Sequence, residues 1–197
     1  MRVSRQKMEE NREQILRTAS LLFRDKGFDG VGIDAVMQGA GLTHGGFYRH
    51  FASKDDLAAQ ALAAALERGA ERQASFTDLR ELVSSYLSDR HCADRAHGCA
   101  IAALGSEVAR QNKGLRHLLA AQLQARLDKI AGLLRVGSAK QRRERAIATL
   151  AGMVGALILA RAVDDPALSR EILGAARRAF GGEPGAGDAA PARRQGQ

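Results

Sequence analysis

The sequence predicts an all-α protein, and three observations support this prediction. Apolar residues recur at intervals of three and four along nearly the whole chain, which is the spacing of one face of an α-helix. No segment alternates apolar and polar residues with the β-branched enrichment typical of strands. The chain has 197 residues, of which 45% are hydrophobic and 26% charged, so it can bury a core; this excludes a wholly disordered protein.

Local signals place the first three helices. The first is expected to begin at residues 11–14, where Asn-Arg-Glu-Gln has the pattern of a capping box, and to end at Gly27. A second short helix is expected over residues 33–40, with Gly41 ending it. Thr43 is then placed to cap a third short helix.

The remaining helices form a longer second part. An Ala- and Leu-rich helix is expected from Ser53 to about Gln73, because residues 53–56 are a second capping-box pattern. Helical periodicity then recurs in five segments, which are residues 78–90, 98–111, 114–135, 141–163 and 166–180. The Gly-rich end of the chain cannot build a core and is expected to be disordered. We therefore expect three parts, residues 1–56, 57–180 and 181–197.

Composition narrows the class of protein. The chain has 30 basic and 22 acidic residues, a formal charge of +8, which favours a polyanionic partner. The longest weakly polar stretch, residues 146–160, is shorter than the roughly 20 residues that span a bilayer. The basic N-terminus leads into acidic residues rather than an apolar signal segment. With only two cysteines, the chain is expected in a reducing cytoplasm, with no membrane partner.

Residues 33–51 have the outline of a helix-turn-helix, two short helices joined at a glycine. In such a unit the second helix enters the major groove of double-stranded DNA and presents its first residues to base edges. Those residues are Thr43, His44, Gly45 and Gly46. Two glycines in a helix cost about 1 kcal/mol each relative to alanine, and close approach of the backbone to DNA would offset that cost.

Side chains suited to phosphate oxygens follow at once. They are Tyr48, Arg49, His50 and Lys54. Each of the first three also has a structural alternative: packing for Tyr48, a solvated surface position for Arg49, and a hydrogen-bonded core position for His50. The basic residues at positions 2, 5 and 7 either form an arm that adds non-specific attraction to DNA or are an ordinary chain terminus.

The segment from Gly41 to Leu57 reads GLTHGGFYRHFASKDDL. It resembles the N-terminal signature of the tetracycline-repressor (TetR) family of transcriptional regulators, and the match covers about residues 11–62. The resemblance implies an N-terminal three-helix helix-turn-helix DNA-binding domain and a C-terminal helical bundle for ligand binding and dimerisation. One position departs from the family pattern: Gly32 stands where the family usually has a serine or threonine that caps the second helix and contacts a phosphate.

The resemblance also implies roles for individual residues. Those at bases or nearby phosphates are Thr43, His44 and Gly46. Those on the DNA backbone are Tyr48, His50 and Lys54. Phe51 and Leu57 match core positions that hold the recognition helix against the long helix after it.

The last two predicted helices carry apolar stripes. The predicted stripes include Leu150, Met153, Val154, Leu157, Ile158 and Arg161 in the first helix, and Ile172 and Phe180 in the second. These helices either complete the core of one chain or, as the family resemblance implies, pair with their copies across a two-fold axis. We expect a homodimer, because a helix-turn-helix regulator spans two half-sites about 34–36 Å apart.

Residues 91–99 contain two histidines and two cysteines, which raises the question of a metal site. The spacing lacks the paired pattern of zinc sites, so no metal is expected. Cys92 as a thiol sensor is an open alternative. A ligand pocket is expected from Tyr86, Cys99, Ala103 and Glu107. The Glu107 carboxylate would receive a cationic effector unless it is solvated or paired with a nearby arginine.

Together these observations predict a cytoplasmic transcriptional regulator that binds a palindromic DNA operator as a homodimer. A small-molecule or thiol-reactive effector of unknown identity would release it, and repression rather than activation is what the resemblance implies. The alternative is a helical ligand or redox sensor without specific DNA binding. No cofactor and no catalysis are expected, because no nucleophile–base pair, phosphate-binding loop or close carboxylate pair stands out.

Overall fold

The computed structural model describes residues 4–182, and every regular element within that range is a helix. The all-α prediction is confirmed. The helices are α1 (Arg5–Lys26), α2 (Ile33–Gly39), the 3-10 helix η1 (His44–Arg49), α3 (Lys54–Ala74), α4 (Leu79–Tyr86), α5 (Asp89–Ala93), α6 (Ala100–Val108), α7 (Lys113–Leu133), α8 (Ala139–Ala162) and α9 (Pro166–Phe180). The expected disorder of the C-terminal tail concerns residues that, from 183 onward, lie outside this range.

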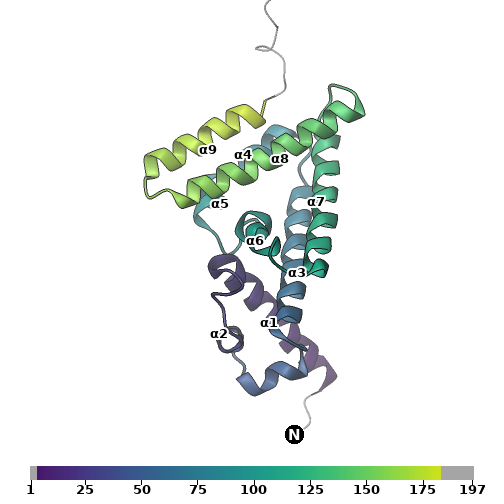
Figure 1. Ribbon diagram of the computed structural model, residues 1–197, viewed down its shortest axis with the longest axis vertical. Coiled ribbons are helices and arrows are strands. Elements are labelled where there is room, and N and C mark those ends of the chain that lie inside the picture. Colours follow the sequence, from purple (N-terminus) through teal and green to yellow (C-terminus); the bar gives the residue numbers. More distant parts are fainter. Residues whose placement is uncertain (1–3, 183–197) are drawn as a thin grey trace, which may run out of the picture.

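The helices divide along the long axis of the molecule (Figure 1). Helices α1, α2 and η1 form a small head at one end, and α8 and α9 cross the opposite end. The long helices α3 and α7 run side by side and α6 lies between the two ends, in contact with α1, α3, α7 and α8. We call α3–α9 the regulatory half, after the role that the family resemblance implies for it, and within it α6 contacts both α1 of the head and α8.

Helix α1 begins earlier than the sequence indicated. Ser4 is its N-cap and accepts a hydrogen bond from the Lys7 amide (3.1 Å), so Asn11 lies inside the helix and caps nothing. The predicted end is correct, since Gly27 has a φ of +77°, a conformation that residues with a side chain rarely adopt.

The helix-turn-helix turns at Gly41, whose φ is +68°. The recognition segment after it forms a 3-10 helix rather than an α-helix, with the Gly46 amide bonded to the Thr43 carbonyl (3.0 Å). Thr43 is the N-cap, as predicted, but its side chain makes no capping hydrogen bond. Ser53 does cap α3, through the Asp56 amide (3.1 Å).

The head has its own aromatic core. Phe47, Phe51 and Leu57 are almost completely buried, and the rings of the two phenylalanines lie 5.8 Å apart. This confirms the predicted core positions at the start of α3 and fixes the recognition segment against that helix.

The regulatory half follows the predicted segments closely, with one difference. The segment expected over residues 78–90 is two helices, because Ser88 caps a new helix, α5, two residues after α4 ends. Helices α8 and α9 pack on each other, and α9 begins at Pro166 with Asp165 as its N-cap.

Helix α8 corrects one expectation. With 24 residues it is long and apolar enough to cross a membrane by length and composition, although the sequence suggested that its apolar stretch is too short. A core helix of a soluble protein passes the same test. Buried residues of α8, among them Met153 and Leu157, pack into the chain's own core, so this property is weak support for a membrane.

Candidate nucleic-acid interface and regulatory cavity

All eight residues predicted to contact DNA reach the surface of the head. Tyr48 is 67% exposed, although its ring also packs edge-on against Phe47, with centroids 5.1 Å apart. The exposed members of the set are Thr43, His44, Gly45, Tyr48 and Arg49, and the half-buried ones are Gly46, His50 and Lys54. The structure therefore brings the predicted residues together on one end of the molecule.

The two glycines of the recognition segment have no structural role within the chain. A Cβ atom added at Gly45 would meet no atom within 4 Å, and one added at Gly46 would meet only the Met37 methyl group, at 3.5 Å. Neither has the positive φ that makes glycine necessary at Gly41. Alanine would thus fit at both positions, so the space around them does not require glycine.

The two histidines of this surface have different surroundings. The Nδ1 atom of His44 pairs with the Asp34 carboxylate of α2, which orients the exposed ring. The pKa of His50 is lowered by partial burial and by the positive charges of Arg12 and Arg49. His50 is therefore favoured as a neutral hydrogen-bond partner rather than as a cation.

Gly32 is the N-cap of α2 and offers no side-chain hydrogen bond. Nothing lies within 4 Å of a Cβ atom placed there, so a serine would fit. Gly32 therefore lacks the hydroxyl group of the phosphate contact that the resemblance implies, although the backbone leaves room for one.

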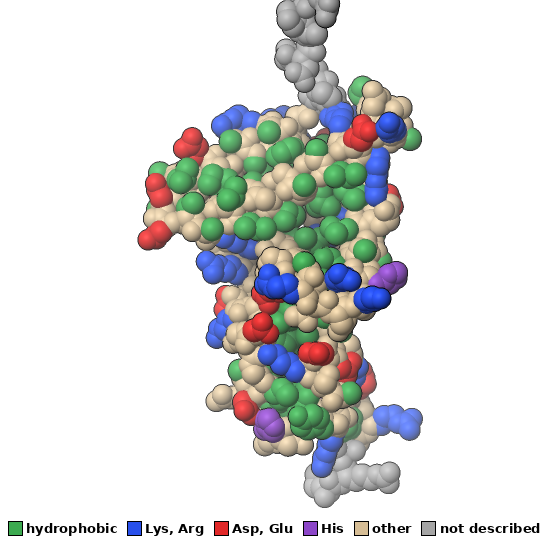
Figure 2. All heavy atoms as spheres, in the orientation of Figure 1, with side chains coloured by type: hydrophobic (Ala, Val, Ile, Leu, Met, Phe, Trp, Pro, Cys, Tyr) green, Lys and Arg blue, Asp and Glu red, His purple; other side chains and the backbone are tan. Residues whose placement is uncertain are grey.

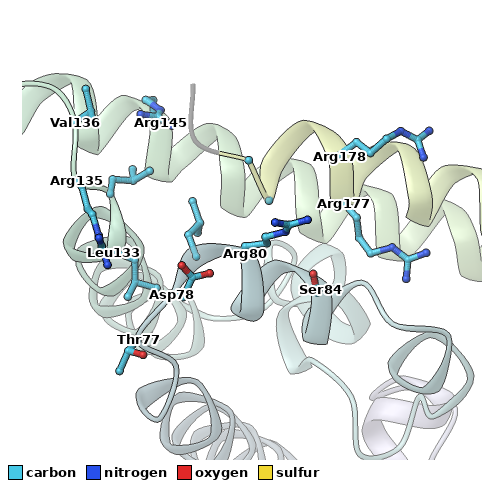
Figure 3. A pocket seen from close by; sticks show the side chains of 14 residues that line it. Thr77, Asp78, Arg80, Ser84, Leu133, Arg135, Val136, Arg145, Arg177 and Arg178 are labelled. Carbon is cyan, nitrogen blue, oxygen red and sulfur yellow. The ribbon is translucent and has the colours of Figure 1, made fainter. Parts of the chain in front are cut away.

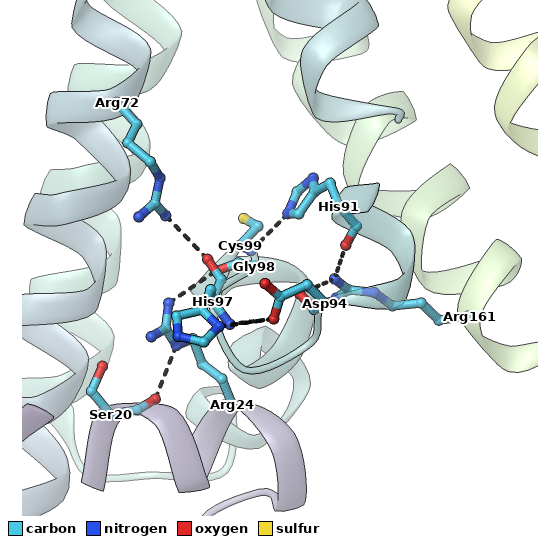
Figure 4. Close-up of polar contacts among 9 residues, drawn as sticks. All are labelled: Ser20, Arg24, Arg72, His91, Asp94, His97, Gly98, Cys99 and Arg161. Carbon is cyan, nitrogen blue, oxygen red and sulfur yellow. Dashed lines mark hydrogen bonds and ion pairs between the residues drawn. The ribbon is translucent and has the colours of Figure 1, made fainter. Parts of the chain in front are cut away.

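Two contacts fasten α1 of the head to α6. The buried guanidinium of Arg24 donates to the Gly98 carbonyl (3.0 Å), immediately before α6, and to the Ser20 carbonyl (2.9 Å), as Figure 4 shows. Burial, together with Arg68 and Arg72, lowers the pKa of Arg24 to about 10. Near the other end of α6, the Glu107 carboxylate accepts from the Phe28 amide (2.7 Å).

The Glu107 contact corrects part of the predicted pocket. Its carboxylate lies directly over Gly27, where a Cβ atom would come within 2.6 Å of Oε1. Glu107 thus joins α6 to the segment that follows α1. The sequence singled it out as unusual, and its carboxylate accepts from a backbone amide at the place where a cationic effector was expected.

A cavity of about 700 Å³ lies in the regulatory half, among α3, α4, α5, α7 and the segment before α6; we call it the regulatory cavity. Of the four residues predicted to bind a ligand, Tyr86 and Cys99 line it and Ala103 and Glu107 do not. Sequence reasoning missed Arg126 and His91, which also line it. Arg126 interrupts the apolar stripe of Leu119, Leu123 and Ile130 on α7, and this was the available signal.

The segment over residues 91–99, which forms one wall of the cavity, is pinned by hydrogen bonds (Figure 4). His91 Nδ1 pairs with the Tyr86 carbonyl (2.5 Å), and its Nε2 accepts from the Cys99 amide (2.9 Å). These contacts require the neutral ring, and burial lowers the pKa of His91 accordingly. Arg161 of α8 donates to the carbonyls of His91 (2.6 Å) and Cys92 (3.1 Å).

The two cysteines are free thiols in different surroundings. Cys99 is buried, and its Sγ lies 3.6 Å from Arg126 Nη1; Cys92 is half-buried, with Sγ 4.0 Å from Ser169 Oγ. Among residues 4–182 no three His, Cys, Asp or Glu side chains lie together as metal ligands would. The His97 ring pairs instead with the Asp94 carboxylate (3.0 Å).

The outer face of α8 and α9 is largely apolar (Figure 2). Several residues predicted to form a dimer interface do not reach it: Met153 and Leu157 are 0% exposed and Leu150 is buried, while Arg161 bonds within the chain. Those positions are corrected, because side chains enclosed in one chain leave no surface for a partner. Of the others, Ile158 is 44% exposed and Val154, Ile172 and Phe180 are half-buried. The large exposed apolar side chains of the two helices are Ile147, Ile158, Leu159 and Leu168.

A second cavity, of about 730 Å³, lies among α4, the α7–α8 connection, α8 and α9 (Figure 3). Its lining includes five arginines, which are Arg80, Arg135, Arg145, Arg177 and Arg178. These side chains are exposed or half-buried, so water solvates their charges. No local pattern in the sequence predicted this cluster.

Comparison with known proteins places these features in context. The family model described as bacterial regulatory proteins, tetR family, matches residues 15–61, the region of the helix-turn-helix. No curated protein matches the chain in sequence.

Solved structures resemble almost the whole chain. A TetR-family transcriptional regulator from Cytophaga hutchinsonii has 18% identity and a TM-score of 0.74, covering 91% of this chain and 96% of that one. A TetR transcriptional regulator from Chloroflexus aurantiacus has 26% identity and a TM-score of 0.72, covering 90% and 98%. Reduced NemR from E. coli has 19% identity and a TM-score of 0.72, covering 87% and 95%. The likeness therefore extends through the regulatory half.

Proposed function

Because the chain belongs to the TetR family of bacterial transcriptional regulators, we propose that it is a repressor that binds a palindromic operator as a homodimer and releases it when an effector binds. Residues 1–56 would bind DNA in the cytoplasm, and residues 57–180 would bind the effector and form the dimer. The observation that chiefly supports DNA binding is the exposed recognition segment, with two glycines that the fold itself does not require.

The residues divide by their part in DNA binding. Thr43, His44, Gly45 and Gly46 begin the recognition segment and would lie at base edges or nearby phosphates. Tyr48, Arg49, His50 and Lys54 would hold the phosphate backbone. Replacement of His44 should therefore change operator preference, whereas changes in the second group should weaken binding to all sequences alike.

The apolar outer face of α8 and α9 supports the dimer. Ile158 and Leu159 of α8 and Leu168 of α9 are large apolar side chains left exposed on adjacent helices. The face of these helices that Figure 2 shows, at the end opposite the head, is largely apolar. Contiguous exposed apolar surface is typical of an interaction site, and a two-fold axis there would let both heads face one DNA duplex.

The proposed release mechanism passes through α6. An effector in the regulatory cavity would press on the segment that ends at Gly98 and Cys99, immediately before α6. Movement of α6 would displace α1 through the Arg24 and Glu107 contacts. The two recognition segments would then no longer match one groove repeat, and the operator would be released.

Selection of binding sites from random duplex DNA, followed by gel-shift assays with the full chain, tests this function. The expected result is that the chain binds a palindromic site as a dimer. Tyr48→Phe should bind this site more weakly, whereas Arg143→Gln, a control variant far from the head, should bind it as the natural chain does. The absence of any shift, even at low salt, would instead favour a sensor without DNA binding.

The type of effector has its own test. If a thiol-reactive effector releases the protein, the Cys92→Ser, Cys99→Ser double variant should stay on its operator in oxidant while the natural chain dissociates. Equal release of both proteins by oxidant would rule out thiol chemistry at these positions.

A further inference from the structure

Arg126 carries a positive charge into the interior of the regulatory half. It is 4% exposed, and its Nη2 atom would come within 2.6 Å of a Cβ atom placed at Gly69 on α3. The Nη1 atom reaches only the Cys99 sulfur, and Nε has no hydrogen-bond partner among the described residues. No ion pair joins Arg126 to a carboxylate in residues 4–182. A buried cation with no anionic partner is costly, so its presence on the cavity wall points to a negative ligand.

Tyr86 supplies a second donor on the same cavity. Its side chain is 6% exposed, and its hydroxyl is the other buried polar atom without a partner in the described part of the chain. Burial raises the pKa of Tyr86 well above its usual value, so the hydroxyl remains protonated. A protonated phenol and a guanidinium both donate hydrogen bonds, and a carboxylate can accept from both.

The other polar groups of the cavity agree with a negative ligand. Arg72 and Arg90 line its exposed side. The only carboxylate in the lining, that of Asp94, already accepts from the backbone amide and the ring of His97 (3.0 Å each). Both ring nitrogens of His91 are likewise occupied. The free hydrogen-bonding capacity is thus on cationic and neutral donors.

The cavity also has room and apolar surface for more than an inorganic ion. Its volume of about 700 Å³ is within the usual range for small-molecule sites, and Phe76 and Leu82 contribute apolar lining. An acidic headgroup joined to an apolar body matches both parts of the lining.

We propose that the effector is an organic carboxylate whose headgroup binds Arg126 and Tyr86, with its apolar body along Phe76 and Leu82. This inference rests on the proposed function, in which the regulatory cavity receives the effector. It replaces the cationic effector that Glu107 suggested, since that carboxylate lies at the junction with the head.

Such a ligand has a direct route to the head. Arg72, on the cavity wall, donates to the His97 carbonyl (3.3 Å), and Arg24 of α1 donates to the neighbouring Gly98 carbonyl (3.0 Å). A carboxylate competes for the Arg72 guanidinium, because a charged acceptor forms a stronger hydrogen bond than a carbonyl. Loss of the Arg72 contact would free the segment that Arg24 holds.

Calorimetry on the full chain without DNA tests the headgroup. The probes are benzoate, octanoate and 4-phenylbutyrate, each compared with its neutral amide, and 4-phenylbutylamine as a cation. At least one carboxylate should bind about tenfold or more tightly than its amide, and the amine should not bind. The proposal is overturned if no carboxylate binds, if an amide equals its acid, or if the amine binds best.

Variants then locate the site. Arg126→Gln should weaken binding of the tightest-binding carboxylate by about tenfold or more, and Tyr86→Phe should weaken it by a smaller factor of about three to ten. The matched control is Arg116→Gln, an exposed arginine on the same helix, which should bind as the natural chain does. Natural affinity in both Tyr86→Phe and Arg126→Gln would refute the assignment. If Arg126→Gln fails to fold, Tyr86→Phe decides.

The two proposals fail separately. A chain that binds a carboxylate through Arg126 but has no operator refutes the proposed repressor alone. If the chain binds its operator but binds each carboxylate no more tightly than the corresponding amide, only the proposal of a carboxylate effector is refuted.

Discussion

The surface of the head and the regulatory cavity use the same kinds of side chain in opposite environments. The chain has two tyrosines: Tyr48 on the head is 67% exposed, and Tyr86 in the cavity is 6% exposed. Likewise Arg49 is solvated, whereas Arg126 is enclosed. Exposed donors lose little free energy in the unbound protein and can bind any phosphate, because water forms hydrogen bonds with them when DNA is absent. Enclosed donors are removed from water, and only a specific partner can offset that free-energy cost, which makes the cavity selective.

The histidines repeat this difference. Both His50 and His91 have a lowered pKa, mainly because of burial. For His50 the neighbouring charges that lower the pKa are those of Arg12 and Arg49 on the head, and the charge of Glu9 acts in the opposite direction. For His91 the neutral ring forms two hydrogen bonds that hold the cavity wall. The lowered pKa thus favours a neutral His50 on the surface proposed to bind DNA and a neutral His91 in the hydrogen bonds of the cavity wall.

The largest expected effect separates two adjacent aromatic residues of the head. Phe47→Ala should lower the free energy of unfolding by about 3–5 kcal/mol, because it empties the aromatic core. Tyr48→Phe should change stability by less than about 0.5 kcal/mol but weaken DNA binding roughly tenfold. Urea unfolding and fluorescence anisotropy on the selected operator measure the two quantities. Loss of stability in Tyr48→Phe would mean that this ring is structural.

Two glycines give the next effect. Gly41→Ala should destabilise the head by about 1–2 kcal/mol, because φ there is +68°. Gly45→Ala should leave stability unchanged or raise it by about 0.4–1 kcal/mol, yet weaken operator binding if the backbone approaches DNA there. Natural DNA affinity in Gly45→Ala would contradict the close-approach explanation.

A pH titration compares the histidine environments. Because the pKa of His91 is lowered from 6.5, the unfolded chain binds a proton at a higher pH than the folded chain does. Stability should therefore be full above about pH 6.5 and fall on acidification, by at most about 1.4 kcal/mol per pH unit for this group. His91→Gln should flatten the fall measured by urea unfolding between pH 7.5 and 5.5.

His50 contributes to the same fall with the same sign, so His50→Gln is measured beside His91→Gln. His117→Gln, an exposed position on α7, is the control. An unchanged pH dependence in His91→Gln would show that the neutral ring does not hold the cavity wall.

The smallest effect is electrostatic. Lys54→Ala should weaken binding to all DNA sequences alike and reduce the slope of log K against log salt by about 1, because one phosphate contact is lost. The measurement is anisotropy over a salt series, with Arg143→Gln as the control outside the head. An unaltered slope would remove Lys54 from the phosphate contacts.

Much of the head could be predicted from the sequence, because its signals are local. Gly41 marks the turn, Ser53 caps α3, and the family resemblance implies the core positions of Phe51 and Leu57, which are buried. The family resemblance carried by these same residues is confirmed. The start of α1 was misplaced, since Asn11 and Ser4 both satisfy local capping rules, and the cap forms at Ser4 although the first turns of the helix are largely exposed.

The regulatory half was predicted as a set of helices but not as a site. Its apolar stripes indicated burial, yet Met153 and Leu157 were assigned to a partner chain when they pack within their own. Periodicity identifies an apolar face of a helix without identifying the surface that covers it. Glu107 was recognised as unusual because it is an acid within an apolar stretch, but its partner stayed hidden because the Phe28 amide is 79 residues away in sequence.

The sequence by itself determined the helices, the turn of the helix-turn-helix and the residues exposed on the recognition segment, because these depend on neighbours within one or two helical turns. Only the tertiary structure decided that Arg126 of α7 meets Cys99 at the start of α6 and shares a cavity with Tyr86 of α4, and that α6 is fastened to the head at both of its ends. The physical reason is that the rotation and packing of whole helices decide which polar side chains share an enclosed space. All the contacts of the core together determine that rotation.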